Sequence, residues 1–501
     1  MTHEIYDLLV IGGGINGVSI ARDAAGRGLS VLLCEMGDLA GATSSASSKL
    51  IHGGLRYLEQ YAFRLVAESL RERRILLRNA PHIIRPMEFV LPHVPALRPA
   101  WMIGIGLWLY DRLGGRHDLP RSHAVSLGGS VYGAGLKPAL AKGFVYSDCW
   151  VDDARFVVLT AVDAVRQGAE IHPRTRCSSA RREGDVWRAV LASEAGRRDV
   201  AARALVNAAG PWVEQVIQQV AGANAPAHAR LVKGSHIVVP RVHDGAHAMI
   251  LQNDDGRIIF VIPYEGEFSL IGTTDVLCEH GPQPVEISEA EIDYLCAAVN
   301  RYLARAIGRP DVVWSYAGVR PLYDDGKTDP STVTRDYVLA LDVSGGAAPL
   351  LSVFGGKITT ARKLAEHALE KLARGGIGMG AAWTETAPLP GGEMDSFAAF
   401  LAALRRDFAA LDPAWIEGLA RRHGTRARAI LEGVRTSADL GPSFGGGLYG
   451  REVEWLRREE WARDPADILW RRTKCGLHMT AAERAAFAGL FRDQMASSRS
   501  G

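Results

Sequence analysis

The N-terminal segment of the chain alternates apolar runs with a glycine-rich turn. Tyr6 to Ile11 is an apolar run of strand-forming residues, Ile15 to Gly28 spaces small and apolar residues as a helix does, and Ser30 to Glu35 is apolar again. A strand, a turn, a helix and a second strand in this order form a βαβ unit. The pattern therefore predicts a parallel sheet at the start of the fold.

Further apolar runs and amphipathic segments, which predict additional strands and helices, follow along the chain. Amphipathic spacing predicts a helix over Asp152 to Gln167. Apolar runs predict strands over Ala204 to Asn207 and Leu350 to Phe354, and a helix over Lys357 to Arg374 follows the second of these. Short β-like runs alternate with turn residues from Leu231 to Val343, which predicts a second sheet inserted between these pieces.

The C-terminal part of the chain has only helical patterns. Helices are predicted over Phe397 to Leu411, Ala414 to His423, Ala427 to Val434, Arg451 to Arg458 and Ala481 to Met495. The preceding segment, from Gly375 to Glu393, contains Gly and Pro and predicts a loose linker.

At 501 residues the chain is too long for one ordinary domain. Its elements predict an α/β fold, α+β overall, with a Rossmann-like nucleotide-binding domain that is discontinuous in sequence. We assign residues 1–80, 145–225 and 345–375 to that domain, 81–144 and 226–344 to an antiparallel-sheet domain, and 390–501 to a helical domain.

Composition and charge narrow the choice of partners and compartment. The 58 Lys and Arg residues nearly balance 56 Asp and Glu, so the net charge of +2 gives no argument for a nucleic-acid partner. The six cysteines are scattered without a C-x-x-C pair, which argues against a zinc site or a disulfide framework and fits a reducing compartment. The N-terminus lacks the features of a signal peptide, so we expect a cytoplasmic protein.

One segment is apolar enough to raise the question of a membrane. Residues from about 81 to 121 show no clear period, and within them Pro99 to Tyr110, PAWMIGIGLWLY, lies between Arg98 and Arg112. It is shorter than the roughly 18 residues that span a bilayer. Aromatic residues with cationic flanks suit a membrane interface, and a buried core helix or loop is an equal alternative.

Gly12, Gly14 and Gly17 form a G-x-G-x-x-G motif between the first predicted strand and helix. Such glycines let the backbone approach a pyrophosphate, and the helix N-terminus offers N–H groups to it. Glu35 ends the second strand, where a carboxylate can accept hydrogen bonds from ribose hydroxyls. The motif predicts a dinucleotide site and leaves NAD and FAD open.

Two later segments favour FAD. ALVNAAGPW, from Ala204 to Trp212, and LLSVFGGKITTARKLAE, from Leu350 to Glu366, resemble strand-plus-glycine elements that many flavoproteins bring to the cofactor. The helix start in the second segment is suited to the pyrimidine end of the flavin, where negative charge develops on reduction.

Four further motifs carry a family resemblance. IGGGINGVSIARDAAGRGL from Ile11, TSSASSKLIHGGLRYLE from Thr43, GVRPL from Gly318 and EWARDPADILWRRTKCGL from Glu460 resemble the FAD-dependent respiratory glycerol-3-phosphate dehydrogenases. The resemblance covers nearly the whole chain. Ser19 and Ala361 depart from the pattern of that family, which often has Gly and Tyr at these positions.

The resemblance implies an activity and partners. It implies oxidation of sn-glycerol 3-phosphate to dihydroxyacetone phosphate, with electrons passing through FAD to membrane quinone. It also implies a glutathione-reductase-like FAD domain of the amino-acid-oxidase type, an antiparallel substrate domain, a helical C-terminal domain, peripheral attachment to the cytoplasmic face of the inner membrane and a homodimer.

The reaction needs groups that hold a phosphate and accept a proton. Arg56, Arg320 and Lys357 are the candidates for the phosphate, because guanidinium and ammonium groups bind such anions. His236 is the candidate base, since an imidazole can titrate near the operating pH, and His52 competes with it.

Flavin-binding residues are assigned from the family motifs, and no metal site is expected. In HGGLRY, whose glycines are Gly53 and Gly54, we expect close approach of the backbone to the flavin, with Arg56 directed at the phosphate. The residues assigned to the flavin are Gly12, Gly14, Gly17, Glu35, Thr43, Ser44, Ser48, Lys49, Gly210, Gly355, Gly356 and Thr359.

Three alternatives stay open at this point. An oxidase would pass the electrons to oxygen instead of quinone. The substrate of an amine or amino-acid oxidase would present a carboxylate, and SSKLIHGGLRYLE and Lys357 argue against that class of enzyme. A flavin-folded scaffold protein without catalysis would bind FAD that no polyol phosphate reduces.

Overall fold

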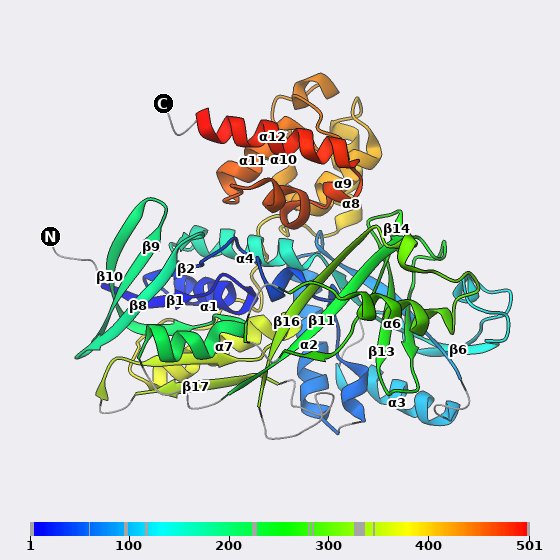
Figure 1. The fold of residues 1–501 in the computed structure, drawn as a ribbon, viewed down its shortest axis with the longest axis horizontal. Coiled ribbons are helices and arrows are strands. Elements are labelled where there is room, and N and C mark those ends of the chain that lie inside the picture. Colours follow the sequence, from blue (N-terminus) through cyan, green and yellow to red (C-terminus); the bar gives the residue numbers. More distant parts are fainter. Residues whose placement is uncertain are drawn as a thin grey trace.

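Two sheets, the helices around them and a separate group of C-terminal helices make up the molecule (Figure 1). The structure, a computed structural model, describes residues 5–59, 61–94, 99–115, 119–222, 228–278, 281–282, 285–324, 336–343 and 346–497. Its helices are α1 (Ile15–Gly26), α2 (Phe63–Asn79), α3 (Ala100–Leu113), α4 (Asp153–Arg166), α5 (Val213–Gln215), α6 (Glu289–Asn300), α7 (Ala361–Arg374), α8 (Phe397–Asp407), α9 (Pro413–His423), α10 (Ala427–Ile430), α11 (Gly450–Glu459) and α12 (Ala481–Ser497). The α/β class is confirmed.

The first sheet has a parallel centre with antiparallel additions. Its path is β17 (Val338–Asp342), β18 (Leu350–Phe354), β10 (Gly196–Asn207), β1 (Ile5–Ile11), β2 (Val31–Cys34) and β7 (Glu170–His172), with β9 (Val186–Ser193) paired to β10 and β8 (Arg176–Glu183) paired to β9. β1 lies parallel to both β2 and β10, and β10 is parallel to β18. The predicted βαβ unit is confirmed.

Helices α1, α4 and α7 pack together beside this sheet. Leu8, Val10, Val18 and Ile20 are fully buried there, in a core that reaches to the small residues of α4. Because β1 and β2 carry apolar residues on both faces, they suit the centre of a covered sheet.

The second sheet is mostly antiparallel. Its path is β15 (Val276–Leu277), β11 (Ala229–Pro240), β14 (Phe268–Gly272), β13 (Ile258–Tyr264), β12 (Ala248–Gln252), β4 (Ile84–Pro92), β6 (Lys142–Val151) and β3 (Leu50–Ile51), with β16 (Trp314–Tyr323) on β11 and β5 (His123–Ser126) on β6. The predicted boundary at residue 145 falls within β6 and assigns most of this strand to the nucleotide-binding domain, whereas its ladder with β4 places it in this sheet.

The segment from 375 to 393 is not the loose linker that its composition predicts. The Trp383 indole donates to the Asp23 carbonyl (3.2 Å) and packs so closely on Gly26 that a Cβ there would lie 2.1 Å from the ring. Thr384 and Leu389 are buried. The prediction was wrong because Gly and Pro content does not report the partners that α1 offers.

The C-terminal helices α8 to α12 sit as a separate layer over α4 (Figure 1). Buried ion pairs tie this layer to the first sheet and its helices. Arg155 on α4 pairs with Glu460, and Arg472 donates to Asp38 Oδ1 at 2.7 Å. The arginines hold the pKa of the Glu460 carboxyl well below its ordinary value, although burial alone would raise it. Breaking such a pair costs about 3–5 kcal/mol, so we expect the layer to be firmly docked.

Candidate flavin and substrate site

A cavity of about 900 Å³ opens at the carboxyl ends of the parallel strands. Gly12 follows β1, Glu35 follows β2, Ala208 follows β10 and Gly355 follows β18, and all four residues line it. Ligands bind at this edge of open parallel sheets, and the volume is within the range of cofactor sites. The second sheet closes the other side of the cavity.

The glycine motif brings three backbone segments to contact distance. A Cβ on Gly12, whose φ is +116°, would lie 2.4 Å from the Ala208 carbonyl oxygen, and one on Gly17 would lie 1.9 Å from the Gly12 oxygen. Gly12 and Gly14 line the cavity, whereas Gly17 does not and serves the packing of α1 on β1. The N-cap residue of α1 is Gly14, which has no side chain with which to cap the helix.

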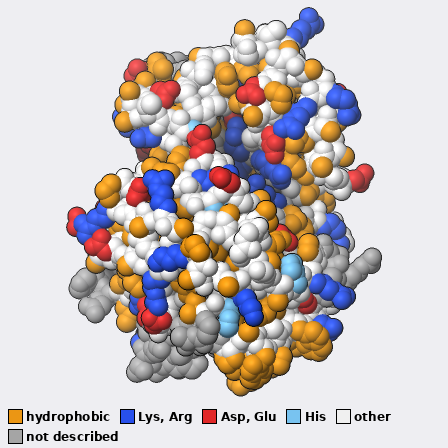
Figure 2. Space-filling model, turned by 90° about the vertical axis from the view of Figure 1, so that its right-hand side faces the viewer, with side chains coloured by type: hydrophobic (Ala, Val, Ile, Leu, Met, Phe, Trp, Pro, Cys, Tyr) orange, Lys and Arg blue, Asp and Glu red, His pale blue; other side chains and the backbone are white. Residues whose placement is uncertain are grey.

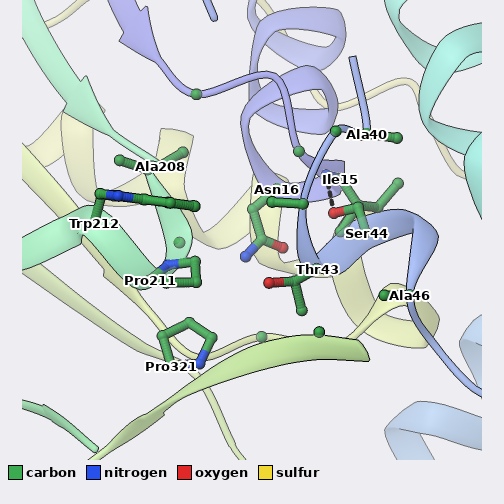
Figure 3. A pocket seen from close by; sticks show the side chains of 18 of the residues that line it. Ile15, Asn16, Ala40, Thr43, Ser44, Ala46, Ala208, Pro211, Trp212 and Pro321 are labelled. Atoms are coloured by element: carbon green, nitrogen blue, oxygen red, sulfur yellow. Dashed lines mark hydrogen bonds between the residues drawn. The ribbon is translucent and has the colours of Figure 1, made fainter. Parts of the chain in front are cut away.

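Thr43 and Ser44 belong to the loop that faces the start of α1 (Figure 3). Ser44 Oγ accepts from the Ile15 N–H (3.0 Å), and Thr43 Oγ1 donates to the Val319 carbonyl (2.5 Å). Both residues line the cavity as predicted. Their hydroxyls are already used within the protein, so each anchors the loop as well as facing the cavity.

Glu35 also lines the cavity. Its carboxylate accepts from the N–H groups of Gly13 and Gly37, each at 2.7 Å. Burial raises the pKa of the carboxyl, and these two N–H donors oppose that rise. A carboxylate has further lone pairs, so Glu35 can still accept from ribose hydroxyls.

Several lining residues were not singled out from the sequence. Asn16 donates to the Gly355 carbonyl (3.1 Å), while its buried Oδ1 accepts no hydrogen bond from the residues that the structure describes. An unsatisfied buried acceptor at the cavity wall suits a ligand with hydroxyl groups. Trp212 lies along the same wall, and the C-terminal layer adds Asp467 and Arg471. Asn16 stands inside the glycine motif, which was the available signal.

Another polar group at the cavity wall, the ammonium of Lys357, has no hydrogen-bond partner among the described residues. Lys357 follows the Gly355–Gly356 turn, and its Nζ is buried. It lies 3.8 Å from the ring centroid of Tyr57. Because a buried ammonium without an acceptor is costly, this arrangement favours an anion in the cavity.

Arg320 on β16 lines the same cavity. It is not free, since its Nη2 donates to the Thr274 carbonyl (3.1 Å) and pairs with Asp275. A guanidinium has five N–H donors and can bind an anion as well. The side chain of Arg56, the third predicted cation, lies outside the described residues.

His236 on β11 also lines the cavity. Its Nε2 is 2.9 Å from Ser48 Oγ, and its ring stacks on Tyr316 with centroids 4.9 Å apart. Burial, helped by Lys49 and Arg320, lowers the pKa of His236 to about 3. The expectation of a pKa near the operating pH was therefore wrong, and the ring is neutral at that pH.

Lys49 does not contact the cavity, contrary to its assignment. It is 1% exposed, and its Nζ lies 2.8 Å from Asp153 Oδ1. A buried lysine needs a counter-ion, and Asp153 supplies it from the far side of the loop. Ser48, its neighbour, does line the cavity.

The glycines of HGGLRY meet protein rather than open space. A Cβ on Gly53 would lie 2.6 Å from the hydroxyl of Tyr110 on α3, and one on Gly54 would lie 2.2 Å from the Tyr57 ring. The Cβ positions of these glycines are thus occupied by Tyr110 of α3 and by the ring beside Lys357, and neither glycine lines the cavity. His52 lines the cavity, and its N–H donates to Thr359 Oγ1 (3.3 Å).

The remaining predicted flavin residues lie where the two later motifs meet the cavity. Gly210, Gly355, Gly356 and Thr359 all line it. Gly356 has a φ of +95°, and a Cβ there would lie 2.7 Å from Asn16 Nδ2. The turn therefore needs glycine on both counts, and it delivers Lys357 and the start of α7 to the cavity.

The cavity suits FAD on the chemistry of its walls. Backbone N–H groups at the start of α1, apart from that of Ile15, and at the helix start before α7 offer donors for phosphate and flavin oxygens, and Glu35 and Asn16 offer acceptors. Hydrogen-bond donors and acceptors thus line the whole cavity, as the binding of a dinucleotide requires.

A family model described as "FAD dependent oxidoreductase" matches residues 7–362, and a second, "C-terminal domain of alpha-glycerophosphate oxidase", matches residues 382–493. The chain belongs to the FAD-dependent oxidoreductases. The predicted cofactor is confirmed by this membership.

This FAD-dependent oxidoreductase has relatives that match along nearly its whole length. The "Glycerol-3-phosphate dehydrogenase" of Pseudomonas aeruginosa is 54% identical and covers 96% of the chain and 94% of the relative. The "D-erythritol 1-phosphate dehydrogenase" of Brucella abortus is 52% identical, covering 97% and 98%. A crystal structure of the glycerol-3-phosphate dehydrogenase from Bacillus halodurans complexed with FAD has 26% identity, a TM-score of 0.74 and coverage of 98% and 95%.

These comparisons confirm the resemblance that the sequence motifs predicted. Of the two departures from the family pattern, Ala361 is fully buried in the core and Ser19 is 6% exposed on α1. Neither residue lines the cavity, so neither alters its walls.

Proposed function

We propose that this oxidoreductase converts sn-glycerol 3-phosphate to dihydroxyacetone phosphate. The observation that carries the proposal is the buried Lys357 Nζ, which has no hydrogen-bond partner among the described residues and lines the same cavity as Arg320. Two cations there match the phosphate of a small polyol phosphate, and the relatives named above act on such compounds.

Bound FAD supplies the acceptor for the hydride that leaves the substrate carbon. Lys357 and Arg320 hold the phosphate, and the Arg56 side chain is assigned to the same task on family grounds. His236 is neutral, so its ring can accept the proton of the substrate hydroxyl, either directly or through Ser48 Oγ at 2.9 Å. His52 is the alternative base on the same wall.

A four-carbon polyol phosphate is the second candidate substrate. The Brucella relative is nearly as similar to this chain as the Pseudomonas one is, at 52% against 54% identity. Overall identity therefore does not separate the two substrates, since both place a phosphate at one end and a secondary hydroxyl beside it.

The proposed electron acceptor is membrane quinone, reached from a lipid surface on which α3 rests. Among the described residues no helix is both long and apolar enough to cross a bilayer. α3 instead exposes Trp101, Met102, Ile105 and Trp108, at 47–66% of their surface, on the face opposite its buried Leu107 and Tyr110. Hydrophobic side chains gather at the lower end of the molecule in Figure 2, where Figure 1 places α3.

This exposure argues against the alternative of a buried core helix. Trp and aliphatic residues on one helix face, with Arg112 stacked over Trp108 at 3.8 Å, suit the boundary between headgroups and acyl chains. Peripheral attachment to the cytoplasmic membrane face follows as part of the proposal. A homodimer is proposed by analogy with the family.

Anaerobic spectroscopy tests the substrate. The holoenzyme in detergent is mixed with sn-glycerol 3-phosphate, D-erythritol 1-phosphate, glycerol or a D-amino acid, and the flavin band is followed. Bleaching by the first compound fastest supports the proposal; bleaching by the four-carbon compound fastest supports the second candidate. If neither phosphate compound bleaches the flavin band, the alternative of a non-catalytic flavin-binding scaffold protein is favoured.

Reoxidation and sedimentation test the acceptor and the membrane. The reduced enzyme is mixed with a short-chain quinone or with oxygen, and faster reoxidation by oxygen would favour an oxidase. Wild-type protein should sediment with lipid vesicles. The variant Trp101→Ser/Trp108→Ser should bind them about a hundredfold or more weakly, because each aromatic side chain removed from the lipid costs about 1.5–3 kcal/mol. Val131→Ser, which removes an exposed apolar residue outside α3, is the control.

A further inference from the structure

A buried cation, Lys49, lies close to His236 but does not line the cavity. Lys49 Nζ is held by Asp153 Oδ1 at 2.8 Å and donates to the Ser45 carbonyl at 3.2 Å. The Tyr316 ring contacts both this cation and the histidine. Its centroid is 5.0 Å from Lys49 Nζ and 4.9 Å from the centroid of His236, with the two rings 20° from parallel.

The loop that carries Lys49 also binds both rings. The Tyr316 hydroxyl donates to the Ser47 carbonyl (2.8 Å), and Ser47 Oγ donates to Asp153 Oδ2 (2.8 Å). The next residue, Ser48, contacts His236 Nε2 at 2.9 Å. One short loop therefore joins the ion pair, the tyrosine ring and the imidazole.

The second sheet leaves the imidazole little room to move. A Cβ on Gly272 would lie 2.2 Å from His236 Cδ2, so the ring rests directly on the backbone of β14. With Tyr316 stacked on the ring as well, a change of the tyrosine position changes the imidazole position. Lys49 is 1% exposed and has a φ of +56°, so its own place is tightly set.

We propose that Lys49, held by Asp153, is a positioning residue for His236: through Tyr316 and Ser48 it fixes the imidazole in the cavity wall. The role of His236 as proton acceptor rests on the proposed function. The arrangement of Lys49, Tyr316 and His236 does not.

The charges around His236 agree with this role. The cations that act on it are Lys49 and Arg320, and together with burial they lower its pKa to about 3. The nearest carboxylates are engaged elsewhere, since Asp153 is bound to Lys49 and Asp275 to Arg320. Ser48 and Tyr316, which contact the ring, are neutral at ordinary pH. Removing Lys49 withdraws one repulsion and frees the charge of Asp153, and both changes raise the pKa of His236.

The test is the titration of His236 in the holoenzyme, followed by NMR of ¹³C-labelled histidine from pH 4 to 8, with His236→Gln to assign the signal. In wild type and in Lys49→Arg, which keeps the cation, we expect a flat signal. In Lys49→Met we expect the titration to move up by about one pH unit or more, into this range. If that variant does not fold, Lys49→Met/Asp153→Asn, which leaves no unpaired buried charge, replaces it.

Lys474→Met is the matched control. Lys474 is also buried, at 4% side-chain exposure, and it pairs with Asp152, the neighbour of Asp153, but it does not contact the two rings. This variant should lose stability yet leave the His236 signal flat. The proposal is overturned if His236 titrates near its ordinary value in wild type, or if Lys49→Met behaves as Lys474→Met does.

Rapid mixing with sn-glycerol 3-phosphate gives the second readout. Lys49→Met should reduce its flavin about half as fast at pH 4 as at pH 8, with KM little changed, because an imidazole whose pKa has risen from about 3 to about 4 is half protonated at pH 4. Wild type, which is only about a tenth protonated at pH 4, should keep a nearly flat profile. Wild-type flavin that the substrate does not reduce would overturn the proposed function alone, because the NMR titration needs no substrate. A flat kinetic profile in Lys49→Met, with substrate active, would overturn the positioning role.

Discussion

The two ends of the cavity are built in different ways. The nucleotide end consists of backbone segments that touch each other, with Gly12 and Gly17 at distances no side chain permits. The substrate end consists of side chains, Lys357, Arg320 and His236, which come from three distant parts of the chain. On the proposed function, the first end offers N–H groups and helix starts to the cofactor, and the second offers charges to the substrate.

This difference separates holding the cofactor from selecting the substrate. A backbone cradle recognises a pyrophosphate whatever lies beyond it, and many oxidoreductases of different specificity share it. Side chains at the other end can change without disturbing that cradle. Substitutions at the two ends should therefore give different losses: of FAD at one, and of substrate turnover with FAD retained at the other.

Gly17→Ala should have the largest effect. The new Cβ would lie 1.9 Å from the Gly12 oxygen and would push α1 away from β1. Since an overpacked site costs about 1–3 kcal/mol or more, we expect FAD content, read from the 450 nm absorbance, to fall to about a tenth or less. Gly489→Ala, on α12 with no atom within 4 Å of the new Cβ, should keep full FAD. Equal FAD in both variants would show that the contact does not matter.

Lys357→Met should spare the flavin and lose turnover. Removing a charge-assisted contact costs about 1.5–3 kcal/mol in binding, and more where the contact strengthens during reaction. We expect kcat/KM for sn-glycerol 3-phosphate to fall about a hundredfold or more, by steady-state assay with a dye acceptor. Lys363→Met removes a neighbouring lysine on α7 that pairs with Glu366 outside the cavity, and it should change kcat/KM little. Loss of FAD from Lys357→Met would break the division between the two ends.

The sequence predicted the nucleotide end well because that end is local. β1, the glycine turn, α1 and β2 follow one another along the chain, and their spacing alone places Gly12, Gly14 and Glu35. The substrate end was predicted in part, and only through family motifs. Lys49 was assigned wrongly because its partner, Asp153, is more than a hundred residues away, and nothing in SSKLIHGG indicates which way the side chain turns.

Other failures have the same origin. β4 and β6 are strands because they pair with each other, and their sequences show no clear alternation. The need for glycine at position 53 is explained by its contact with Tyr110 on α3, and the motif itself gives no indication of that contact between distant segments. The pKa of His236 depends on burial and on cations brought by folding, so a residue type alone gave the wrong value.

Arg320→Ala should have a smaller effect than Lys357→Met, because Arg320 is already engaged by Asp275 and gains less from the substrate. We expect KM for sn-glycerol 3-phosphate to rise about tenfold, with FAD retained. Asp275→Asn keeps the Arg320 guanidinium and removes the carboxylate that competes with the substrate phosphate for it. The KM of this variant should therefore stay low. An unchanged KM in Arg320→Ala would remove this residue from the phosphate site.

Glu35→Gln should give the smallest effect and only at the nucleotide end. The amide keeps one acceptor but loses the charge that accepts from Gly13 and Gly37. We expect FAD to bind about fivefold more weakly, by roughly 1 kcal/mol, in a titration of the apoprotein followed by flavin fluorescence. The reduction rate of the FAD-saturated variant should match wild type. A slower reduction at full FAD loading would mean that the two ends are not independent.

The most direct test of this division compares phosphorylated and unphosphorylated substrate in wild type and Lys357→Met. Flavin reduction is followed without oxygen, with sn-glycerol 3-phosphate and with glycerol, at equal FAD loading. We predict that wild type prefers the phosphate by about a thousandfold or more, and that this preference falls at least tenfold in Lys357→Met while FAD stays bound. An unchanged preference in the variant, or loss of its FAD, would contradict the account.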